Sequence, residues 1–496
     1  MPIPIIDLFA GPGGLNEGFS RVTDSRGRPV FTTLTSVEME ANAHRTLELR
    51  ALFRRLDDAG RLSYRDYTMG LITREALFNR AGAAGIEACR EAMLATLGES
   101  PTVDAEIEAR IGAALKKAGS GPWVLIGGPP CQAYSLMGRA RRTNEPEKFA
   151  RDKKHTLYRE YLRIVQKFAP TVFLMENVPG LLSATLKGQR TFELIVQDFS
   201  EAGYDLHALG GSPDNLIPDP TNYVLNAEEY GIPQARSRIF ILGVRKGSGL
   251  KPGGLVKTAG GRSGLSSVSA AIGDLPEIRS RMSKEKDSGP AWQAAIQAIN
   301  AYAFKGMDGE LAAGIRVRST LLRDNLPLGK QFVDKMKNPV LHRDWYEDFE
   351  MPVVLNHNSR GHMTSDLLRY FFWAEYGRIF KKSPKLADAP FYLRPNHGNV
   401  QGTAEDAPFA DRFRVQLSDR PSTTVTSHIS KDGHYYIHPN SLQCRSLSVR
   451  EAARLQTFPD TYFFEGNITA QYGQVGNAVP PLLAKKLGDL ISDMLR

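Results

Sequence analysis

Cysteine and long apolar runs are both scarce in this sequence, and each absence excludes a class of protein. Its 496 residues include only three cysteines, Cys89, Cys131 and Cys444, an odd number with no paired spacing. This argues against a disulfide framework and a cysteine-based zinc site, and it favours a reducing compartment. No run of about 18 apolar residues occurs, so we expect no membrane span. The opening segment, MPIPIIDLF, has no basic residues before its apolar run and is not a signal peptide, so we expect a cytoplasmic protein.

Negative charge is in deficit. The chain has 63 Lys and Arg residues against 54 Asp and Glu residues, a net charge of +9 and a pI of about 9.3. This excess mildly favours a polyanionic partner such as nucleic acid. A hydrophobic content of 42% and a charged content of 24% are ordinary for a globular protein. The length is sufficient for two or three domains.

Short apolar segments alternate with segments of helical periodicity over the first half of the chain. This alternation predicts an α/β fold, with a mostly parallel sheet and helices on both faces. A stretch rich in Ala, Glu, Arg and Leu, about 70–120, interrupts it and is expected to be a helical insertion. The expected strands are Ile3–Leu8, Phe31–Val37, Trp123–Ile126, Thr171–Met175 and Arg238–Val244, and the expected helices are Leu15–Arg21, Ala41–Leu56, Thr156–Phe168 and Gly188–Ala202.

The alternation stops after about residue 245. Lys246–Gly264 is rich in Gly, Lys and Ser and is typical of a linker. Near the C-terminus order returns, with a helix over Ser448–Gln456 in which Ser448 and Glu451 have the spacing of a capping box, and a closing helix over Pro480–Leu495. We therefore expect one domain over 1–245, an irregular second domain over 246–425, and a C-terminal part, 426–496, that returns to the first domain.

A proline–cysteine pair lies in the turn GGPPCQAYS, after the apolar strand Trp123–Ile126. The break at Gly127 to Pro130 puts Cys131 at the mouth of a strand, where an open α/β sheet places its chemistry. A thiol held on a rigid turn is a candidate nucleophile. The alternative is a small buried cysteine, a common role for a lone Cys.

A glycine-rich turn, DLFAGPGG, follows the first strand. Its glycines would let a cofactor approach the backbone, although the pattern GxGG departs from the dinucleotide fingerprint GxGxxG. A plain tight turn is the alternative. Glu38 ends the second strand, where nucleotide-binding folds place a carboxylate that accepts hydrogen bonds from ribose hydroxyls. Its alternative is a solvated surface residue.

Three further segments carry candidate functional groups. Glu176 in MENVPG ends a buried strand, where partial desolvation would raise the pKa of its carboxyl group. Arg236 and Arg238 in QARSRIF alternate along a strand and could face a charged ligand. Asn477 lies in a turn before the closing helix. The alternatives are a capping or salt-bridged role for Glu176, an exposed strand face for the two arginines, and ordinary helix capping for the turn at Asn477. The histidines of SHISKDGHYYIH match no helical zinc motif, so we expect no metal.

Taken together and in order, these motifs resemble the cytosine-5 DNA methyltransferase family, in particular its bacterial and phage restriction–modification members. The resemblance covers about half of the chain, spread over both ends. It implies a Rossmann-like S-adenosylmethionine-dependent catalytic domain, interrupted by a smaller target-recognition domain over 246–425. The matching segments are DLFAGPGG, GGPPCQAYS, ENVPG, QARSRIFILGV, RSLSVREAARLQTFPDTY and GNAVPP.

The family chemistry gives these residues roles. The Cys131 thiolate would add to carbon 6 of a flipped-out cytosine, and carbon 5 would then attack the methyl group of the cofactor. Glu176 would hydrogen-bond ring nitrogen 3 and the exocyclic amine, and Arg236 and Arg238 would complete the catalytic set. The residues implied in DNA binding are Gln132, Ser135, Arg139, Arg141 and Arg142.

The resemblance also implies a set of cofactor contacts. We expect an acidic residue near the adenine after the third strand, and Asp66 is the candidate, although the segment between Asp66 and Cys131 is longer than the family pattern usually allows. The full expected set is Phe9, Ala10, Gly11, Gly13, Glu38, Asp66, Pro130, Asn177, Asn477 and Val479.

Duplex DNA is the expected partner, because about 180 residues stand where the relatives that methylate tRNA have a small segment. The same chemistry on tRNA, a catalytically silent DNA-binding protein and a nicotinamide dehydrogenase remain alternatives. We also expect a monomer without membrane association, which could serve beside an independently acting restriction endonuclease.

Overall fold

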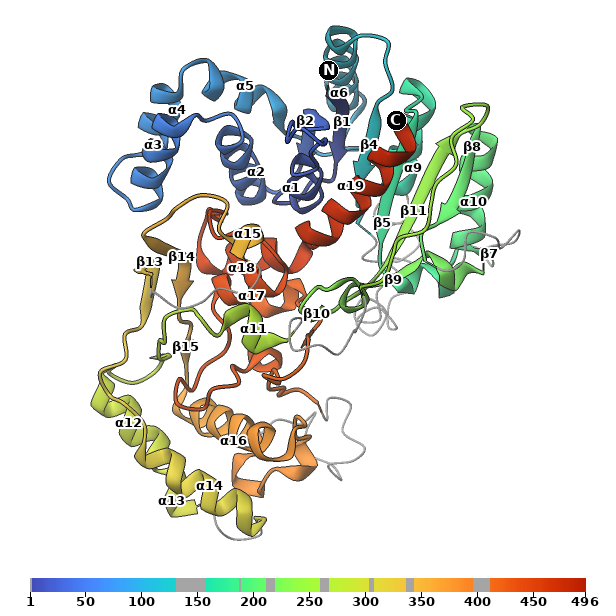
Figure 1. Cartoon of the computed structure of the whole chain (residues 1–496). Coiled ribbons are helices and arrows are strands. Elements are labelled where there is room, and N and C mark those ends of the chain that lie inside the picture. The colour runs from blue at the N-terminus through green and yellow to red at the C-terminus, as the bar shows by residue number, and fades with distance from the viewer. Residues whose placement is uncertain are drawn as a thin grey trace. The chain divides into compact units, whose positions relative to one another are not determined.

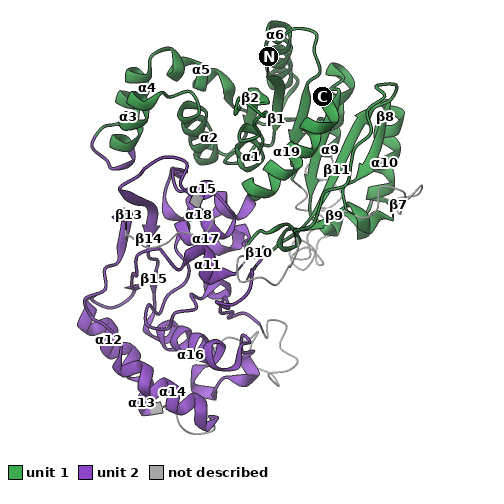
Figure 2. Cartoon of the chain, in the orientation of Figure 1, with its two compact units in different colours: residues 1–67, 72–261, 478–496 green, residues 68–71, 262–477 purple. Residues whose placement is uncertain are grey.

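The computed structural model describes residues 2–130, 157–186, 189–210, 219–258, 267–302, 307–335, 343–395 and 411–496. The chain divides into two compact units, which Figure 2 colours separately. Unit 1 comprises Met1–Tyr67, Ile72–Gly261 and Ala478–Arg496, and unit 2 comprises Thr68–Leu71 and Arg262–Asn477. The division differs from the expected one, because residues 426–477 group with unit 2 and only residues 478–496 return to unit 1.

Unit 1 is built around one eight-stranded sheet (Figure 1). Its strands are β1 (Ile3–Leu8), β2 (Phe31–Glu38), β3 (Ala92–Leu94), β4 (Val124–Gly127), β5 (Val172–Asn177), β8 (Tyr204–Ala208), β9 (Val224–Asn226) and β11 (Ser237–Arg245). They run in the order β3-β2-β1-β4-β5-β11-β8, and β9 also pairs with β11. The first five of these are mutually parallel, whereas β11 is antiparallel to its neighbours. The mostly parallel α/β sheet is confirmed.

Helices cover both faces of this sheet, because successive residues of each central strand point to opposite sides and both sides are apolar. Phe173 and Met175 pack on one side with Ile164 of α9 (Leu157–Phe168), while Leu174 packs on the other with Leu483 of α19 (Pro481–Leu495). The helices of unit 1 are α1 (Gly14–Ser20), α2 (Ala41–Phe53), α3 (Asp58–Thr68), α4 (Arg74–Ala81), α5 (Ala83–Glu91), α6 (Pro101–Ala118), α9 (Leu157–Phe168), α10 (Thr191–Glu201) and α19 (Pro481–Leu495). Shorter elements are η2 (Pro179–Ser183), β6 (Thr185–Leu186), β7 (Gln189–Arg190), η3 (Pro220–Tyr223), η4 (Ala227–Tyr230) and β10 (Gln234–Ala235).

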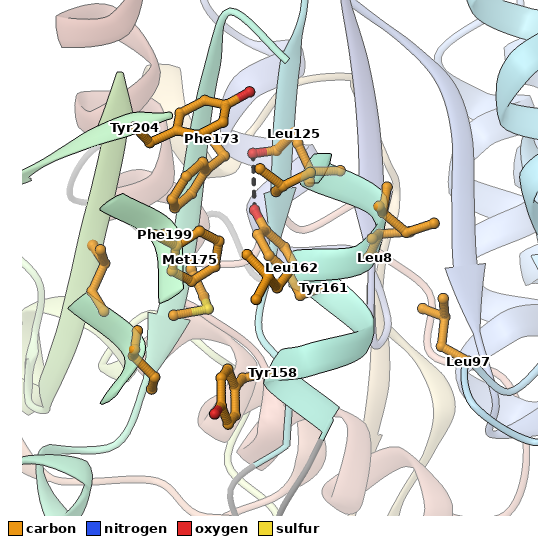
Figure 3. Close-up of a cluster of buried hydrophobic side chains, with 14 of the residues drawn as sticks. Leu8, Leu97, Leu125, Tyr158, Tyr161, Leu162, Phe173, Met175, Phe199 and Tyr204 are labelled. Atoms are coloured by element: carbon orange, nitrogen blue, oxygen red, sulfur yellow. Dashed lines mark hydrogen bonds between the residues drawn. The ribbon is translucent and has the colours of Figure 1, made fainter. Parts of the chain in front are cut away.

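Tyr161 on α9 anchors the core on its side of the sheet (Figure 3). The side chain is fully buried, and its hydroxyl lies 3.2 Å from the carbonyl oxygens of both Leu125 and Leu174. Its ring also packs edge-on against Phe173 and Phe199. The buried hydroxyl has a hydrogen-bond acceptor, and this directional contact fixes the position of α9 against the central strands β4 and β5.

The segment around residues 70–120 is mostly helical, as expected, but it is not simply an insertion. It contributes β3, which pairs in parallel with β2 at the edge of the sheet, and α6, whose Ile107 and Ile111 are fully buried in the core. This finding also corrects the placement of Asp66, which lies within α3. The third strand in chain order is β3, so Asp66 precedes that strand instead of following it.

Unit 2 packs its core around one long helix, α16. This helix buries side chains on nearly every side, including Tyr370 and Trp373, and the Trp373 indole donates to the Phe413 carbonyl oxygen at 2.9 Å. The expected capping box of Ser448 and Glu451 is present at the start of α17. The helices of unit 2 are α11 (Val268–Ile272), α12 (Gly289–Gln297), α13 (Ile299–Tyr302), α14 (Gly309–Thr320), α15 (Arg343–Tyr346), α16 (Thr364–Phe380), α17 (Val449–Leu455) and α18 (Ile468–Asn477), with η6 (Leu386–Asp388), η7 (Phe391–Leu393), η8 (Ser427–Ser430) and η9 (His434–Tyr436).

The strands of unit 2 are short and paired in twos. β13 is antiparallel to β14, and β12 is parallel to β15. The bounds are β12 (Arg281–Met282), β13 (Gly329–Asp334), β14 (Val353–Asn358), β15 (Gly361–His362) and β16 (Ser422–Thr423). Among the described residues of both units, no helix has the length and apolarity that a bilayer crossing requires.

Candidate functional site

The candidate site lies at the edge of the unit 1 sheet where β1, β4 and β5 end. Leu8 is in register with Gly127, and Gly127 is in register with Met175, so β1 and β4 finish at the same level and β5 continues two residues further, to Asn177. A Cβ on Gly127 would lie 2.4 Å from the Leu8 carbonyl oxygen, which explains why a glycine ends β4. Ligands of open α/β sheets bind at this end of the strands.

The glycine-rich turn after β1 has a backbone that side chains rarely tolerate. Gly11 has a φ of 58° and Gly13 a φ of 96°, and even Phe9 has a positive φ of 55°. A non-glycine residue held in this region stores strain, which is found most often at ligand sites. A Cβ on Gly11 would meet no atom within 4 Å, so the backbone there borders open space. The turn therefore leaves room for a ligand beside the main chain.

Glu38, the last residue of β2, is joined directly to this turn. Its carboxylate accepts from the Gly11 amide at 2.7 Å and from the Glu40 amide at 2.8 Å. The residue is only 8% exposed, and this burial raises the pKa of its carboxyl group against the opposing effect of these amides. A carboxylate has about four acceptor positions, and the Met39 amide also contributes a hydrogen bond, so Glu38 keeps room for a further donor. The neighbouring Met39 is 56% exposed, an apolar surface that the sequence interpretation missed.

Glu176 and Arg238 form an ion pair at the same edge. The Arg238 Nε lies 2.9 Å from the Glu176 Oε1, and both side chains are 14% exposed. The pair forms because β11 runs antiparallel to β5, which brings the beginning of β11 beside the end of β5. Burial lowers the pKa of Arg238, and the charge of Glu176 opposes that effect. A Cβ on Gly128 would lie 3.0 Å from the Glu176 Oε2, so this glycine leaves space for the carboxylate.

Asn177 holds the chain just before Cys131. Its amide nitrogen donates to the Pro129 carbonyl oxygen at 3.3 Å, and its side-chain oxygen accepts from the Val178 amide at 2.8 Å. The side chain thus links the ends of β4 and β5, and Pro130 directly follows the bonded proline. Six expected site residues lie outside the described residues, namely Cys131, Gln132, Ser135, Arg139, Arg141 and Arg142.

Arg236 and Val479 lie near the start of α19. Arg236 is 2% exposed and donates from Nη2 to the Ala478 carbonyl oxygen at 2.9 Å, whereas Arg238 turns to Glu176. The two arginines therefore bind different partners, and Arg236 precedes β11 instead of alternating along it. A Cβ on Gly14 would lie 2.3 Å from the Val479 carbonyl oxygen, so the glycine turn and the residues before α19 are in close contact.

Asp7 is a candidate that the sequence interpretation missed. It is fully buried in β1, and neither carboxylate oxygen has a hydrogen-bonding partner among the described residues. Burial, followed by the charges of Glu38 and Glu91, raises the pKa of Asp7 well above its ordinary value. The signal in the sequence is a single acid at the end of an otherwise apolar strand, IPIIDL. Unpartnered buried acids of this kind gather at functional sites.

Two expected cofactor residues belong to other elements. Asp66 lies in α3 of unit 1, and Asn477 ends α18 as the last residue of unit 2, directly before Ala478 and Val479 of unit 1. The histidines considered as metal ligands have other partners in unit 2. His434 Nδ1 lies 2.7 Å from the Tyr370 hydroxyl, and His438 lies 3.4 Å from the Glu451 carboxylate.

The edge combines two chemically different parts. Around the glycine turn, Glu38 offers acceptors for hydroxyl donors, Met39 offers an apolar surface, and Asp7 offers unused acceptors. These features suit a ligand that carries a ribose and a positive charge. At the end of β5, Glu176 and Arg238 present an acceptor and a donor side by side, which suits a heterocycle with both kinds of group.

Comparisons with known proteins agree on one family. The family model of C-5 cytosine-specific DNA methylases matches residues 116–493. Type II methyltransferase M.Bpa9945I of Bacillus paralicheniformis is 29% identical over 508 residues, covering 99% of each chain. DNA (cytosine-5-)-methyltransferase M.ApeKI of Aeropyrum pernix is 26% identical, covering 99% of this chain and 98% of its own. A solved prophage-encoded protein of E. coli, assigned as a DNA modification methyltransferase, shares the fold with a TM-score of 0.50 at 19% identity, covering 99% of both chains.

Proposed function

The chain belongs to the C-5 cytosine-specific DNA methylase family, and we propose that it methylates carbon 5 of a cytosine within a specific sequence of duplex DNA. Members of this family are DNA (cytosine-5-)-methyltransferases that use S-adenosylmethionine. The observation that carries the proposal is the Glu176–Arg238 pair, which stands at the end of β5 beside the Pro129 turn that leads to Cys131. A pyrimidine and a nucleophile can meet at such an edge.

The cofactor fits the part of the edge around the glycine turn. Glu38 would accept from the ribose hydroxyls. The Gly11 and Glu40 amides fix the orientation of its carboxylate for this role. Met39 would pack on the adenine, and Asp7 would place unused acceptors toward the positively charged end. When bound, the cofactor supplies an electrophilic methyl group. Phe9, Ala10, Gly11 and Gly13 would line it along the strained turn, and Pro130, Asn177, Asn477 and Val479 would complete the set.

Glu176 would recognise the cytosine and stabilise charge on it. Its carboxyl group would hydrogen-bond ring nitrogen 3 and the exocyclic amine. It would donate its proton to nitrogen 3 as the thiolate adds at carbon 6, and take that proton back when the thiolate leaves. Arg238 fixes the orientation of this carboxyl through the 2.9 Å ion pair. Arg236, buried and held by the Ala478 carbonyl oxygen, would support the base at its carbonyl oxygen.

Cys131 would supply the nucleophile. Its thiolate would form a bond to carbon 6, which shifts the ring electrons so that carbon 5 can attack the methyl group. A base, for which water suffices, then removes the carbon 5 proton, and the electron pair of that bond expels the thiolate. The reaction leaves the cysteine unchanged and releases S-adenosylhomocysteine.

The target base must leave the DNA stack for this chemistry. Extruding a paired base costs a few kcal/mol, and contacts to the DNA must supply that energy. Arg139, Arg141 and Arg142, together with Gln132 and Ser135, are the proposed contacts near Cys131. Unit 2, which holds residues 262–477, is large enough to read a duplex sequence. These features favour duplex DNA over tRNA as substrate.

A methyl-transfer assay tests the proposal. The full chain is given labelled S-adenosylmethionine with duplex DNA or with tRNA, and DNA from cells that express it is sequenced after bisulfite treatment. We expect label in DNA and protected cytosines in one short sequence, with neither signal for Cys131→Ser. Label in tRNA alone would support the alternative substrate. Tight DNA binding without transfer would support a catalytically silent protein.

A further inference from the structure

Phe391 is the most exposed large apolar side chain among the described residues. It begins η7 in unit 2 and is 86% exposed, and the next residue, Tyr392, is 38% exposed. A single exposed apolar residue is common at protein surfaces and indicates nothing by itself. Phe391 differs from such residues because buried neighbours and hydrogen bonds hold the backbone that carries it.

Core residues lie on both sides of Phe391 in the sequence. Leu386 is 1% exposed and Leu393 is 2% exposed, and both belong to the hydrophobic core of unit 2. The backbone is bent by two hydrogen bonds, from the Leu393 amide to the Pro390 carbonyl oxygen at 3.0 Å and from the Arg394 amide to the Phe391 carbonyl oxygen at 3.1 Å. Because its neighbours pack into the core around this bend, the Phe391 ring is left in solvent.

Two arginine side chains fix the same turn. Arg369 of α16 donates from Nε to the Leu393 carbonyl oxygen at 2.7 Å. Arg394 donates from Nε to the Ala389 carbonyl oxygen at 3.0 Å and from Nη2 to the Ala387 carbonyl oxygen at 3.1 Å. Hydrogen bonds from charged donors are among the stronger ones in proteins. The backbone under Phe391 is therefore fixed in advance, and the ring loses little conformational freedom when it binds a partner.

The segment that carries Phe391, KKSPKLADAPFYLR, is strongly basic. It contains four cations and one acid, namely Lys381, Lys382, Lys385, Arg394 and Asp388. The three lysines are exposed, whereas the Asp388 carboxylate accepts from the Lys385 amide at 2.8 Å. An excess of exposed positive charge suits a polyanion. A fixed aromatic ring on such a segment therefore favours a nucleic acid as its partner over an apolar protein surface.

We propose that Phe391 inserts at a base step of the target duplex and stacks on a base there, an inference that rests on the proposed function. Apolar side chains that enter the stack separate two base pairs and bend the duplex, which brings more of the DNA backbone against the protein. The exposed lysines of the segment would then contact phosphates. Because every base has a ring face, this contact depends on how easily the step deforms and not on a pattern of donors and acceptors.

A binding measurement tests the inference. The full chain, with S-adenosylhomocysteine, is titrated against its target duplex by fluorescence anisotropy at several salt concentrations. Phe391→Ala should raise Kd roughly 5- to 150-fold, the range of one stack between a base and an aromatic side chain. Phe391→Tyr keeps the ring and should bind as the wild type does. The slope of log Kd against log salt concentration should not change in either variant, because the ring carries no charge.

A photocrosslink locates the contact in the wild-type chain. A 5-iodopyrimidine replaces each pyrimidine of both strands in turn, except the target cytosine, and the complex is irradiated. Iodopyrimidines crosslink to aromatic side chains that stack on them. We expect a crosslink to Phe391, identified by mass spectrometry of the joined peptide, at one base step and not elsewhere.

Val317 provides the matched control. It is 61% exposed on α14 in the same unit, so Val317→Ala also removes an exposed apolar side chain. We expect the wild-type Kd for this variant. Phe391→Ala and Val317→Ala should both melt at the wild-type temperature, because both side chains are mostly in solvent. The crosslink needs no variant, so it tests the inference even where a substitution lowers stability.

Four results would overturn the inference. They are an unchanged Kd for Phe391→Ala, an equal loss for Phe391→Tyr, the absence of any crosslink to Phe391, and a wild-type dimer in sedimentation that Phe391→Ala dissociates, which would show that a second copy covers the ring. A wild-type chain that neither binds nor methylates any duplex would instead refute the proposed function, so the two failures can be told apart.

Discussion

Two buried carboxylates, one in each unit, show opposite behaviour. Glu451 in unit 2 accepts twice from Arg445 at 2.6 Å and once from the Ser448 amide at 2.7 Å. Burial acts to raise its pKa, but Arg445 and His438 outweigh burial, and the pKa falls well below its ordinary value. Asp7 in unit 1 is equally buried, has no hydrogen-bonding partner among the described residues, and has a strongly raised pKa.

This difference indicates that Glu451 has a structural role, whereas Asp7 belongs to a ligand-binding site. A buried charge with all its partners fixes the packing around it, and its removal damages the fold. A buried acid without partners costs stability in its charged form, so it remains only where something else offsets that cost. In unit 1 the acid lies one residue from the end of β1, directly before the glycine turn. The cofactor is the group we propose to complete it.

The largest effect on stability should come from a substitution of Glu451, whose carboxylate is bonded to Arg445 and to the Ser448 amide. Glu451→Gln leaves the Arg445 guanidinium buried without its counter-charge, which should lower the free energy of unfolding by about 3 to 5 kcal/mol. Urea unfolding measures this loss. Arg378→Gln is the control, because Arg378 pairs with Glu375 on α16 with nearly half of its side chain exposed, and its loss should be small. Equal losses would contradict the account of the cluster.

The next effect concerns pH and the capping box. His357 Nε2 lies 2.8 Å from the Pro276 carbonyl oxygen and therefore donates, so its Nδ1 accepts from the Ser448 hydroxyl, also at 2.8 Å. Burial lowers the pKa of His357 to about 4. Between pH 6.5 and 4, His357 binds a proton in the unfolded state but not in the folded state. The free energy of unfolding should therefore fall by about 3 kcal/mol as the pH drops.

Comparing wild type with His357→Gln by urea unfolding at several pH values isolates this contribution. The variant should be less stable at pH 7 but should lose less on acidification. A parallel decline of the two proteins would show that His357 does not carry the dependence.

Glu38 should affect binding more than stability. Glu38→Gln removes the charge that we expect to accept from the ribose hydroxyls, and cofactor affinity should fall roughly 10- to 100-fold, since hydrogen bonds to charged groups contribute about 1.5 to 3 kcal/mol. Calorimetric titration with S-adenosylhomocysteine measures it. In the wild type, affinity should also fall as the pH drops through the raised pKa of Glu38, and the variant should lack this step. Unchanged affinity would remove Glu38 from the site.

Asp7 should give the smallest effect on folding. At pH 7 the variant Asp7→Asn should be as stable as the wild type or slightly more stable, because a neutral amide avoids the cost of the raised pKa, and the difference should vanish below about pH 4. Cofactor affinity should fall several-fold. The matched control is Glu17→Gln, in the same unit, whose partners Arg50 and Arg21 outweigh burial and lower the pKa of Glu17 to about 2. Glu17→Gln should lower the free energy of unfolding at pH 7. If Asp7→Asn lost more stability than Glu17→Gln, the comparison would be contradicted.

The sheet and its edge could be predicted because they depend on local patterns. β4 ends in a glycine, Gly127, whose close contacts admit no side chain, and β1 leads into a turn whose glycines Gly11 and Gly13 have positive φ. The capping box of α17 depends on only four consecutive residues. The ion-pair partner of Glu176 could not be predicted from the sequence in this way. The ion pair with Arg238 depends on β11 running antiparallel, which the chain order alone does not determine.

Other features depend on contacts between distant segments. Asp66 was expected after the third strand because the helical segment beyond it hid β3, a strand of three residues. The burial of Asp7 and the exposure of Phe391 are visible only when the surrounding elements are in place. The domain division differs from the expected one for the same reason. We expected the chain to return to the first domain at residue 426, whereas residues 426–477 belong to unit 2 and only residues 478–496 belong to unit 1.

The most direct test of the central claim traps Cys131 on its substrate. A duplex that carries 5-fluorocytosine at the target position is incubated with the full chain and S-adenosylmethionine, because fluorine at carbon 5 cannot be removed as a proton and the adduct cannot resolve. The account predicts a denaturation-stable protein–DNA complex whose mass spectrum places the bond at Cys131, absent for Cys131→Ser. Methylation of the ordinary duplex without any such complex, or with the bond at another residue, would contradict it.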